Sequence, residues 1–328
     1  MMMMYRLSFT SLVLLVGAAP GAVAKYHDLD MNRDPDIFGT PDFVAGTTYT
    51  VTVALDQVST MEILETKYDT VVKTEGTQEL TVSARAEGGK EIDTVMTHFM
   101  MHMEMMGFAT DFDSDHMDDA PTEFSSFSDL IGVKTTVVID DDGNLVEVKD
   151  TPKLQDENNV DESTEFVQEV QEAKEENNGT ATPFDSSSQY QLMTRLNKAL
   201  PESPVKPGDS WEVISDMNGL GSITGTATLS GYRSYKHCDV AVIHLDGKLE
   251  INLSAVSSLL GTSDATHGAT FQDAEIKSLM FWDNTANLMR WSQSNQTMVM
   301  DIPNPMDEDT TLKIPLSQTI TVTIDEAE

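Results

Sequence analysis

Histidine and methionine side chains are concentrated in one short segment, HFMMHMEMM over residues 98–106. Methionine thioethers are soft ligands that suit Cu⁺, and imidazole with a carboxylate suits Cu²⁺. Side chains alternate between the two faces of a strand, so His98, His102 and Glu104 would share one face. Same-face neighbours on one strand lie about 6–7 Å apart, which favours an ordinary half-buried strand. A copper site on His98, His102 and Glu104 is the alternative interpretation.

The methionines of this segment also suit an apolar binding surface. Methionine is flexible and polarisable, and it is common both in cores and at surfaces that adapt to a ligand. If the protein binds a lipid-like molecule, we expect Met100, Met101, Met103 and Met105 to line the pocket.

A run of carboxylates follows at Asp111, Asp113 and Asp115, in what we expect to be an acidic loop over residues 111–129. Alternating acidic residues suggest a calcium loop, but an EF-hand requires glycine at its sixth position and glutamate at its twelfth. Those positions hold His116 and Thr122. The EF-hand is therefore excluded, and calcium on the three aspartates joins copper as a metal-binding alternative.

Catalytic signatures are absent apart from one partial match. GDS at residues 208–210, with Asp264 and His267, resembles the two ends of an esterase signature. That chemistry requires an α/β scaffold with the serine after a strand, whereas Ser210 precedes an expected strand. No P-loop, dinucleotide fingerprint or zinc-protease motif occurs. The sequence predicts neither an enzyme nor a cofactor.

Sequons at Asn178, Asn252 and Asn295 are candidate N-glycosylation sites. These sites are relevant only if the protein is exported. The amino-terminal residues have the pattern of a signal peptide. Arg6 precedes a mostly apolar stretch over residues 7–16, and small residues lead to an A-x-A site that ends at Ala24. The stretch is too short to span a bilayer. We expect cleavage near Ala24 and a secreted protein, extracellular or periplasmic, with no integral membrane span.

Charge and cysteine content narrow the partners. The net charge of −35 disfavours nucleic acid and anionic lipid. The single cysteine, Cys238, cannot form an internal disulfide, so packing must stabilise the fold, and we expect this thiol to be buried and inert. The partners that remain are an apolar small molecule and a protein.

The residues discussed above would be positioned by β-strands. Alternating patterns predict strands over residues 48–55, 79–86, 92–106, 133–139 and 145–148, and in the second half over 211–214, 223–232, 240–245, 249–253, 276–282, 288–293, 297–302, 312–316 and 319–324. Turn signals lie at Gly88-Gly89, at residues 140–144, at Asp246-Gly247 and at Asp283-Asn284. We predict a mainly β (α+β) fold, a strongly curved antiparallel sheet or open barrel. A finer version of this prediction has two pseudo-repeated halves joined by helices.

The expected organisation along the chain has five parts. A signal peptide (1–24) and an irregular arm (25–46) precede an N-terminal β half (47–150). An acidic linker or helix (151–185) leads to a helix plus a C-terminal β half (186–328). We interpret the mature chain as a non-enzymatic protein that binds a hydrophobic ligand or a partner on a concave face of its sheet. Metal binding is the alternative.

One segment carries a family resemblance. LPESPVKPGDSW over residues 200–211 resembles the LPxxPVxxGDxW segment of a family of bacterial exported domains of unknown function. Phe112-Asp-Ser114, Leu130-Ile-Gly132 and the hairpin from Asp140 to Val148 match the same family in order. The resemblance implies an open, cupped β fold and no reaction. The prolines and Gly208 fix the entry of Trp211 into a strand, so we expect Trp211 to be buried.

Overall fold

The computed structural model describes residues 29–39, 42–63, 66–119, 128, 131–141, 145–149, 200–216, 221–252, 270–303 and 311–327. In these residues the named elements are twelve strands and one 3₁₀ helix, η1 (Ser114–Asp119). The strands are β1 (Thr48–Ile63), β2 (Thr66–Ala84), β3 (Lys90–Met105), β4 (Phe108–Asp113), β5 (Lys134–Ile139), β6 (Leu145–Lys149), β7 (Ser210–Asp216), β8 (Gly221–Tyr235), β9 (Cys238–Ile251), β10 (Thr270–Asp283), β11 (Leu288–Pro303) and β12 (Thr311–Glu326).

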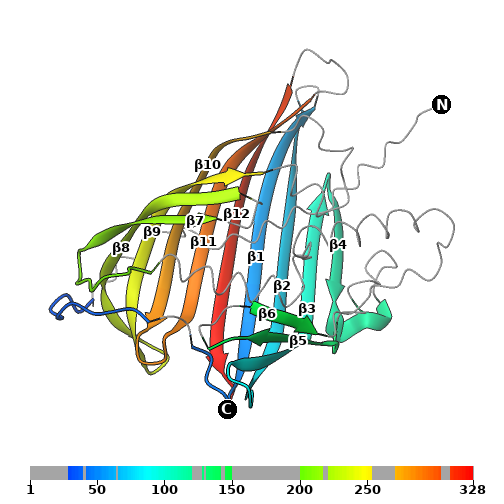
Figure 1. Ribbon diagram of the computed structural model, residues 1–328. Helices are drawn as coiled ribbons and strands as arrows, with labels where there is room; N and C mark the ends of the chain where they lie inside the picture. The colour runs from blue at the N-terminus through cyan, green and yellow to red at the C-terminus, as the bar shows by residue number, and fades with distance from the viewer. Residues whose placement is uncertain are drawn as a thin grey trace.

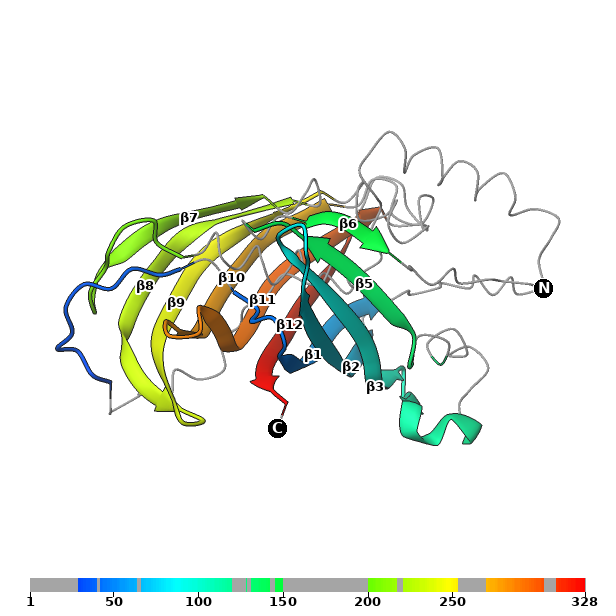
Figure 2. The same cartoon turned by 60° about the horizontal axis from the view of Figure 1, so that its bottom comes forward.

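The strands form one antiparallel sheet in the order β6-β5-β3-β2-β1-β12-β11-β10-β9-β8-β7, with β4 paired to β3 beside this path. The first and last strands meet in the middle, where Tyr49 pairs with Glu326 and Ser59 with Leu316 (Figure 1). The sheet is strongly curved (Figure 2). It is not closed into a barrel, because β6 and β7 end the order without pairing to each other. The prediction of a mainly β, curved antiparallel sheet is confirmed.

The finer prediction of two pseudo-repeated halves joined by helices finds no support in the described residues. Strands from both halves of the chain belong to one continuous sheet through the β1–β12 pairing. The signal peptide (1–24), the acidic linker (151–185), the helix expected over 186–200 except Leu200, and the sequon at Asn178 lie outside the described residues.

Several strands are longer than the sequence pattern predicts, and one expected turn is wrong. Asp246-Gly247 lies inside β9, where Gly247 faces Gly225 of β8. A Cβ on Gly247 would lie 2.8 Å from the backbone oxygen of Thr224. Glycine therefore permits a close approach of two strands here, not a turn. The Asp283-Asn284 turn is confirmed as the start of the connection between β10 and β11.

The main core lies on one face of the sheet, which we call the inner face. A single cluster of buried apolar side chains extends from β5 (Val137, Ile139) across β1 and β12 to β7 (Val213). Phe38 and Phe43 of the irregular arm join it. Strands from nearly both ends of the order can contribute to one cluster because the sheet curves around it. The opposite, outer face carries a smaller cluster around Phe281.

Candidate functional site

The β3–β4 pairing unites the two metal-binding motifs of the sequence. His102 pairs with Asp111 and Met100 with Asp113, so the expected acidic loop begins as strand β4 and not as a loop. A bulge in β3 at Thr97 precedes this region, since His98 pairs with Thr77 and Met96 with the next residue of β2. An inserted residue reverses which side chains face inward. Met96, Phe99 and Met101 consequently pack together, although their numbers do not alternate regularly.

His98, Asp113 and Asp115 form a compact cluster of ligand-type atoms. His98 Nε2 lies 3.3 Å from Asp113 Oδ1 and 3.9 Å from Asp115 Oδ2. One donor atom of each residue lies within 4.8 Å of the others. His116 Nδ1 lies 3.2 Å from the second oxygen of Asp113. We call His98, Asp113 and Asp115 the β3–β4 triad. The sequence suggested both motifs but not this combination, which depends on the bulge and on β4.

A buried hydrogen bond holds the triad's elements together. The backbone N–H of Phe99 in β3 donates to Ser114 Oγ in η1 over 3.0 Å. The backbone N–H of Asp115 donates to Asp113 Oδ1 over 2.9 Å. This hydrogen bond holds the pKa of the Asp113 carboxyl below its usual range, and the nearby His116 and His98 act in the same direction. Asp113 is therefore a carboxylate at neutral pH.

The other predicted metal residues lie outside the triad. His102 Nδ1 and Asp111 Oδ1 are 2.7 Å apart and form a separate pair. Glu104 is exposed opposite Ala109. The predicted ligand-lining methionines also divide: Met101 is buried beside Phe99 and Phe112, Met103 and Met105 are half-buried, and Met100 is exposed.

A separate cluster of polar side chains lies within the apolar inner face. Gln57 of β1, Gln318 of β12 and Gln296 of β11 lie side by side in register. Ser294 of β11 pairs with Ser278 of β10 two residues further along. All five side chains are buried, and we call them the Gln–Ser patch. A polar residue at the apolar position of an alternating strand is the sequence signal that could have identified them.

The hydrogen bonding of this patch is incomplete. Gln318 Nε2 donates to Gln296 Oε1 over 2.5 Å. Gln57 Oε1, Ser278 Oγ and Ser294 Oγ have no hydrogen-bond partner among the described residues, although each atom is shielded from solvent. A buried polar atom without a hydrogen-bond partner lowers the stability of the folded protein by about 1–3 kcal/mol. Most buried polar atoms in proteins therefore have a partner. These three atoms of the Gln–Ser patch mark a place where a polar group can be accepted.

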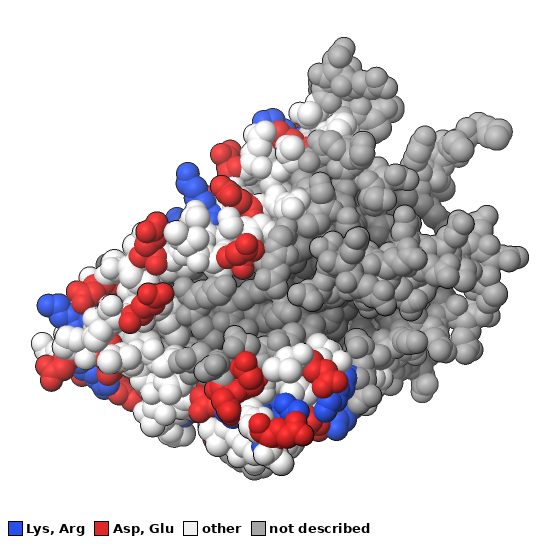
Figure 3. Space-filling view, in the orientation of Figure 1, with Lys and Arg blue, Asp and Glu red and all other residues white. Residues whose placement is uncertain are grey.

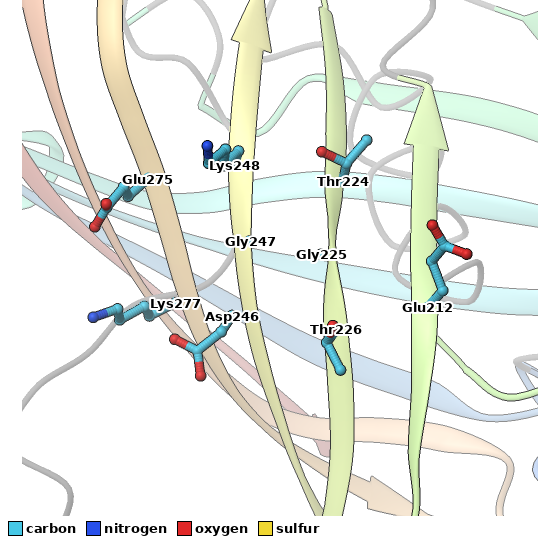
Figure 4. Close-up of a pocket in the computed structure, with 9 residues that line it drawn as sticks. All are labelled: Glu212, Thr224, Gly225, Thr226, Asp246, Gly247, Lys248, Glu275 and Lys277. Atoms are coloured by element: carbon cyan, nitrogen blue, oxygen red, sulfur yellow. The ribbon is translucent and has the colours of Figure 1, made fainter.

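The outer face has a shallow depression of about 640 Å³ around Gly225 and Gly247 (Figure 4). Its lining is polar and of mixed charge: Glu212, Thr224, Thr226, Asp246, Lys248, Glu275 and Lys277. Glu275 pairs in register with Lys248, and Lys277 with Asp246. Opposite charges that face each other in this way neutralise the surface, so the depression suits neither an apolar ligand nor an ion of one sign. Figure 3 likewise shows acidic and basic side chains interspersed over the described surface in that view.

The remaining expectations can be placed on the fold. Asn252 is exposed just after β9, whereas Asn295 is half-buried within β11 and accepts a hydrogen bond from Thr319 Oγ1. Cys238 is partly exposed at the start of β9, and burial raises the pKa of its thiol. Trp211 is only partly buried against the main core, so the expectation of a buried side chain is wrong. It is the second residue of β7, which ends the order of strands and pairs with one described strand, β8.

The fold defines an open, curved antiparallel β-sheet protein (Figure 2). The chain belongs to the Family of unknown function (DUF6263), which it matches over residues 87–268. The resemblance to a family without assigned chemistry is thereby confirmed. None of the curated protein sequences compared with the chain matches it.

Similarity to solved structures is remote. DynF from the dynemicin biosynthesis pathway of Micromonospora chersina is 7% identical, with 90% of this chain and 91% of that chain covered and a TM-score of 0.20. A DUF1329 family protein from Desulfovibrio piger is 6% identical, with 84% and 83% covered and a TM-score of 0.16. An outer membrane lipoprotein-sorting protein domain from Vibrio parahaemolyticus is 7% identical, with 84% and 85% covered and a TM-score of 0.12. Likeness at this level carries no functional argument. Among the described residues there is no helix of the length and apolar character needed to cross a membrane.

Proposed function

We propose that the chain is an exported, non-enzymatic binding protein whose inner face holds a hydrophobic molecule with one neutral polar group. The observation that carries this proposal is the Gln–Ser patch, with three buried oxygen atoms that lack a hydrogen-bond partner among the described residues. Export rests on the signal-peptide pattern of residues 1–24.

The surroundings of the patch suit the hydrocarbon part of such a molecule. Leu55 precedes Gln57 on the inner face of β1, and Leu316 and Ile320 flank Gln318 on β12. Met298 lies next to Gln296 on β11, two residues away. Apolar surface removed from water contributes about 25 cal/mol per Å², so a hydrocarbon chain against these side chains gains most of its binding energy there.

The chemistry of the patch restricts the polar group. Gln57 Oε1 can only accept a hydrogen bond, and the serine hydroxyls can donate or accept. No side chain of the patch carries a charge, so a carboxylate or phosphate would be buried without a counter-charge. The net charge of −35 opposes anions further. The favoured polar group is therefore a neutral hydroxyl or amide, as in a monoacylglycerol, a fatty alcohol or a sterol.

A binding titration tests this proposal directly. Purified protein that begins at Lys25 is delipidated and titrated with a fluorescent monoacylglycerol, then with the fatty acid of the same chain length at pH 7.5. We expect saturable binding of the monoacylglycerol and at least tenfold weaker binding of the fatty acid anion. Absence of saturable binding for monoacylglycerol, fatty alcohol and sterol alike would refute the proposal.

Two matched variants connect the binding to the patch. Gln57→Leu removes an acceptor from the inner face, and we expect it to weaken monoacylglycerol binding about three- to tenfold, the equivalent of one neutral hydrogen bond. The same change at Gln293, a half-buried residue on the outer face of β11, should leave binding unchanged. Equal affinities of the two variants would show that the polar group binds elsewhere.

A further inference from the structure

We propose that the β3–β4 triad, His98, Asp113 and Asp115, is a binding site for one divalent transition-metal ion of the Zn²⁺ class. This site is independent of the inner face, because it is built from β3, β4 and η1. Its donors are one imidazole nitrogen and two carboxylate oxygens, contributed by three elements.

The spacing of the donor atoms matches a metal polyhedron. Zinc binds imidazole nitrogen and carboxylate oxygen at about 2.0–2.2 Å, so neighbouring ligands of a tetrahedral ion lie roughly 3.3–3.6 Å apart. The distances from His98 Nε2 to Asp113 Oδ1 and Asp115 Oδ2 are 3.3 and 3.9 Å. Small side-chain rotations would bring all three atoms onto one ion.

The local scaffold holds these side chains in place before an ion arrives. The buried Phe99–Ser114 hydrogen bond attaches η1 to β3 directly beside His98. His116 Nδ1 lies 3.2 Å from the second oxygen of Asp113, which restrains the carboxylate and leaves Oδ1 toward His98. Outer partners of this kind orient ligands at metal sites. The affinity of a given nitrogen and oxygen site for first-row divalent ions rises along the series to Cu²⁺ and falls at Zn²⁺. Cu²⁺ should therefore bind the triad more tightly than Zn²⁺.

The donor set also argues against Cu⁺ and Ca²⁺, two of the ions that the sequence suggested. Cu⁺ prefers soft sulfur ligands, whereas the donors of the triad are one imidazole nitrogen and two carboxylate oxygens. Calcium requires six to eight oxygen ligands, which two carboxylates and an imidazole do not supply. The triad therefore favours a divalent ion of the Zn²⁺ class over both Cu⁺ and Ca²⁺.

The chain offers a matched control on the same hairpin. His102 and Asp111 form a pair at 2.7 Å with the same residue types and similar exposure of the histidine, but they have no third ligand among the residues that the structure describes. If the triad is only a group of ion pairs, His98 and His102 should behave alike. If it is a metal site, only His98 should matter.

Calorimetric titration of the chain beginning at Lys25 with Zn²⁺ tests this proposal in 5 mM Ca²⁺ and Mg²⁺. We expect one Zn²⁺ per chain for the wild type and for His102→Ala, and at least tenfold weaker binding for His98→Ala and Asp115→Asn. Asp115 is exposed, so Asp115→Asn tests the site without disturbing the fold. Thermal melts should show a Zn²⁺-dependent rise in Tm for the wild type and His102→Ala alone.

Three results would overturn the proposal: no Zn²⁺ binding by the wild type, unchanged affinity in both His98→Ala and Asp115→Asn, or an equal loss of affinity in His102→Ala. None of these results depends on lipid binding. The titration is performed on delipidated protein, so failure of the metal site and failure of the inner-face proposal are distinguishable.

Discussion

Replacing Asp283 by alanine should destabilise the protein strongly, because Asp283 is the buried partner of Arg290. Asp283 Oδ2 accepts hydrogen bonds from Arg290 Nε and from its terminal nitrogen over 3.1 and 3.0 Å. The side chains of Asp283 and Arg290 are only 6% and 10% exposed. The other carboxylate oxygen accepts the backbone N–H groups of Thr285 and Ala286, which begin the β10–β11 turn.

The magnitude follows from the charge that the substitution leaves behind. Removing one member of a buried ion pair costs about 3–5 kcal/mol, since the other charge stays buried without compensation. Glu326 also contacts Arg290 over 2.9 Å, but its side chain is 52% exposed, so it compensates little. A loss of this size is a large share of the roughly 5–15 kcal/mol that stabilises a typical domain.

Urea unfolding of the wild type, Asp283→Ala, Glu326→Gln and the double variant Asp283→Ala/Arg290→Met measures these free energies. We expect a loss of about 3–5 kcal/mol for Asp283→Ala and less than about 1 kcal/mol for Glu326→Gln. The double variant should regain much of the loss, because no charge remains unpaired. A loss below about 1 kcal/mol for Asp283→Ala, or no recovery in the double variant, would refute the reasoning.

Three further predictions concern packing and pH. Trp282 is 1% exposed, so Trp282→Ala should lower the free energy of unfolding in urea by about 3–5 kcal/mol. Trp211→Ala should cause a smaller loss, because the Trp211 side chain is partly exposed. Equal losses would contradict the difference in burial. Gly225→Ala should lower the thermal midpoint by several degrees, because the new Cβ would meet the backbone oxygen of Asp246, and an unchanged midpoint would show that β8 and β9 can separate there. Burial lowers the pKa of His244 below its ordinary 6.5, although Asp246 opposes this shift. The unfolded chain therefore binds the proton first, so stability is fully present above pH 6.5 and falls below it. The variant His244→Gln should unfold with a flatter pH dependence between pH 5 and 7, and a slope equal to that of the wild type would exclude this role.

Much of the architecture follows from patterns among neighbouring residues in the sequence. Alternating residues over 48–55 and 319–324 predict strands because side chains on a strand alternate between an apolar and a polar face. The Asp283-Asn284 turn follows from residues that favour turns on their own. Local patterns fail to predict the structure where a residue is required by contact with a residue distant in the sequence. Gly247 has the sequence of a turn, yet it lies within a strand because Gly225 of β8 approaches it.

The sequence by itself determined that the chain is β-rich, acidic and without a recognised catalytic motif, since composition and alternation are properties of neighbouring residues. Only the tertiary structure decided which of its polar residues meet. The bulge at Thr97 and the pairing of β3 with β4 bring His98 to Asp113 and Asp115, while His102 is left with one partner. The Gln–Ser patch likewise exists only because β1, β12, β11 and β10 are adjacent, although β1 and β12 are the first and last of the described strands. Register and strand order depend on long-range pairing, and this is the physical reason that both candidate sites appear only in the folded molecule.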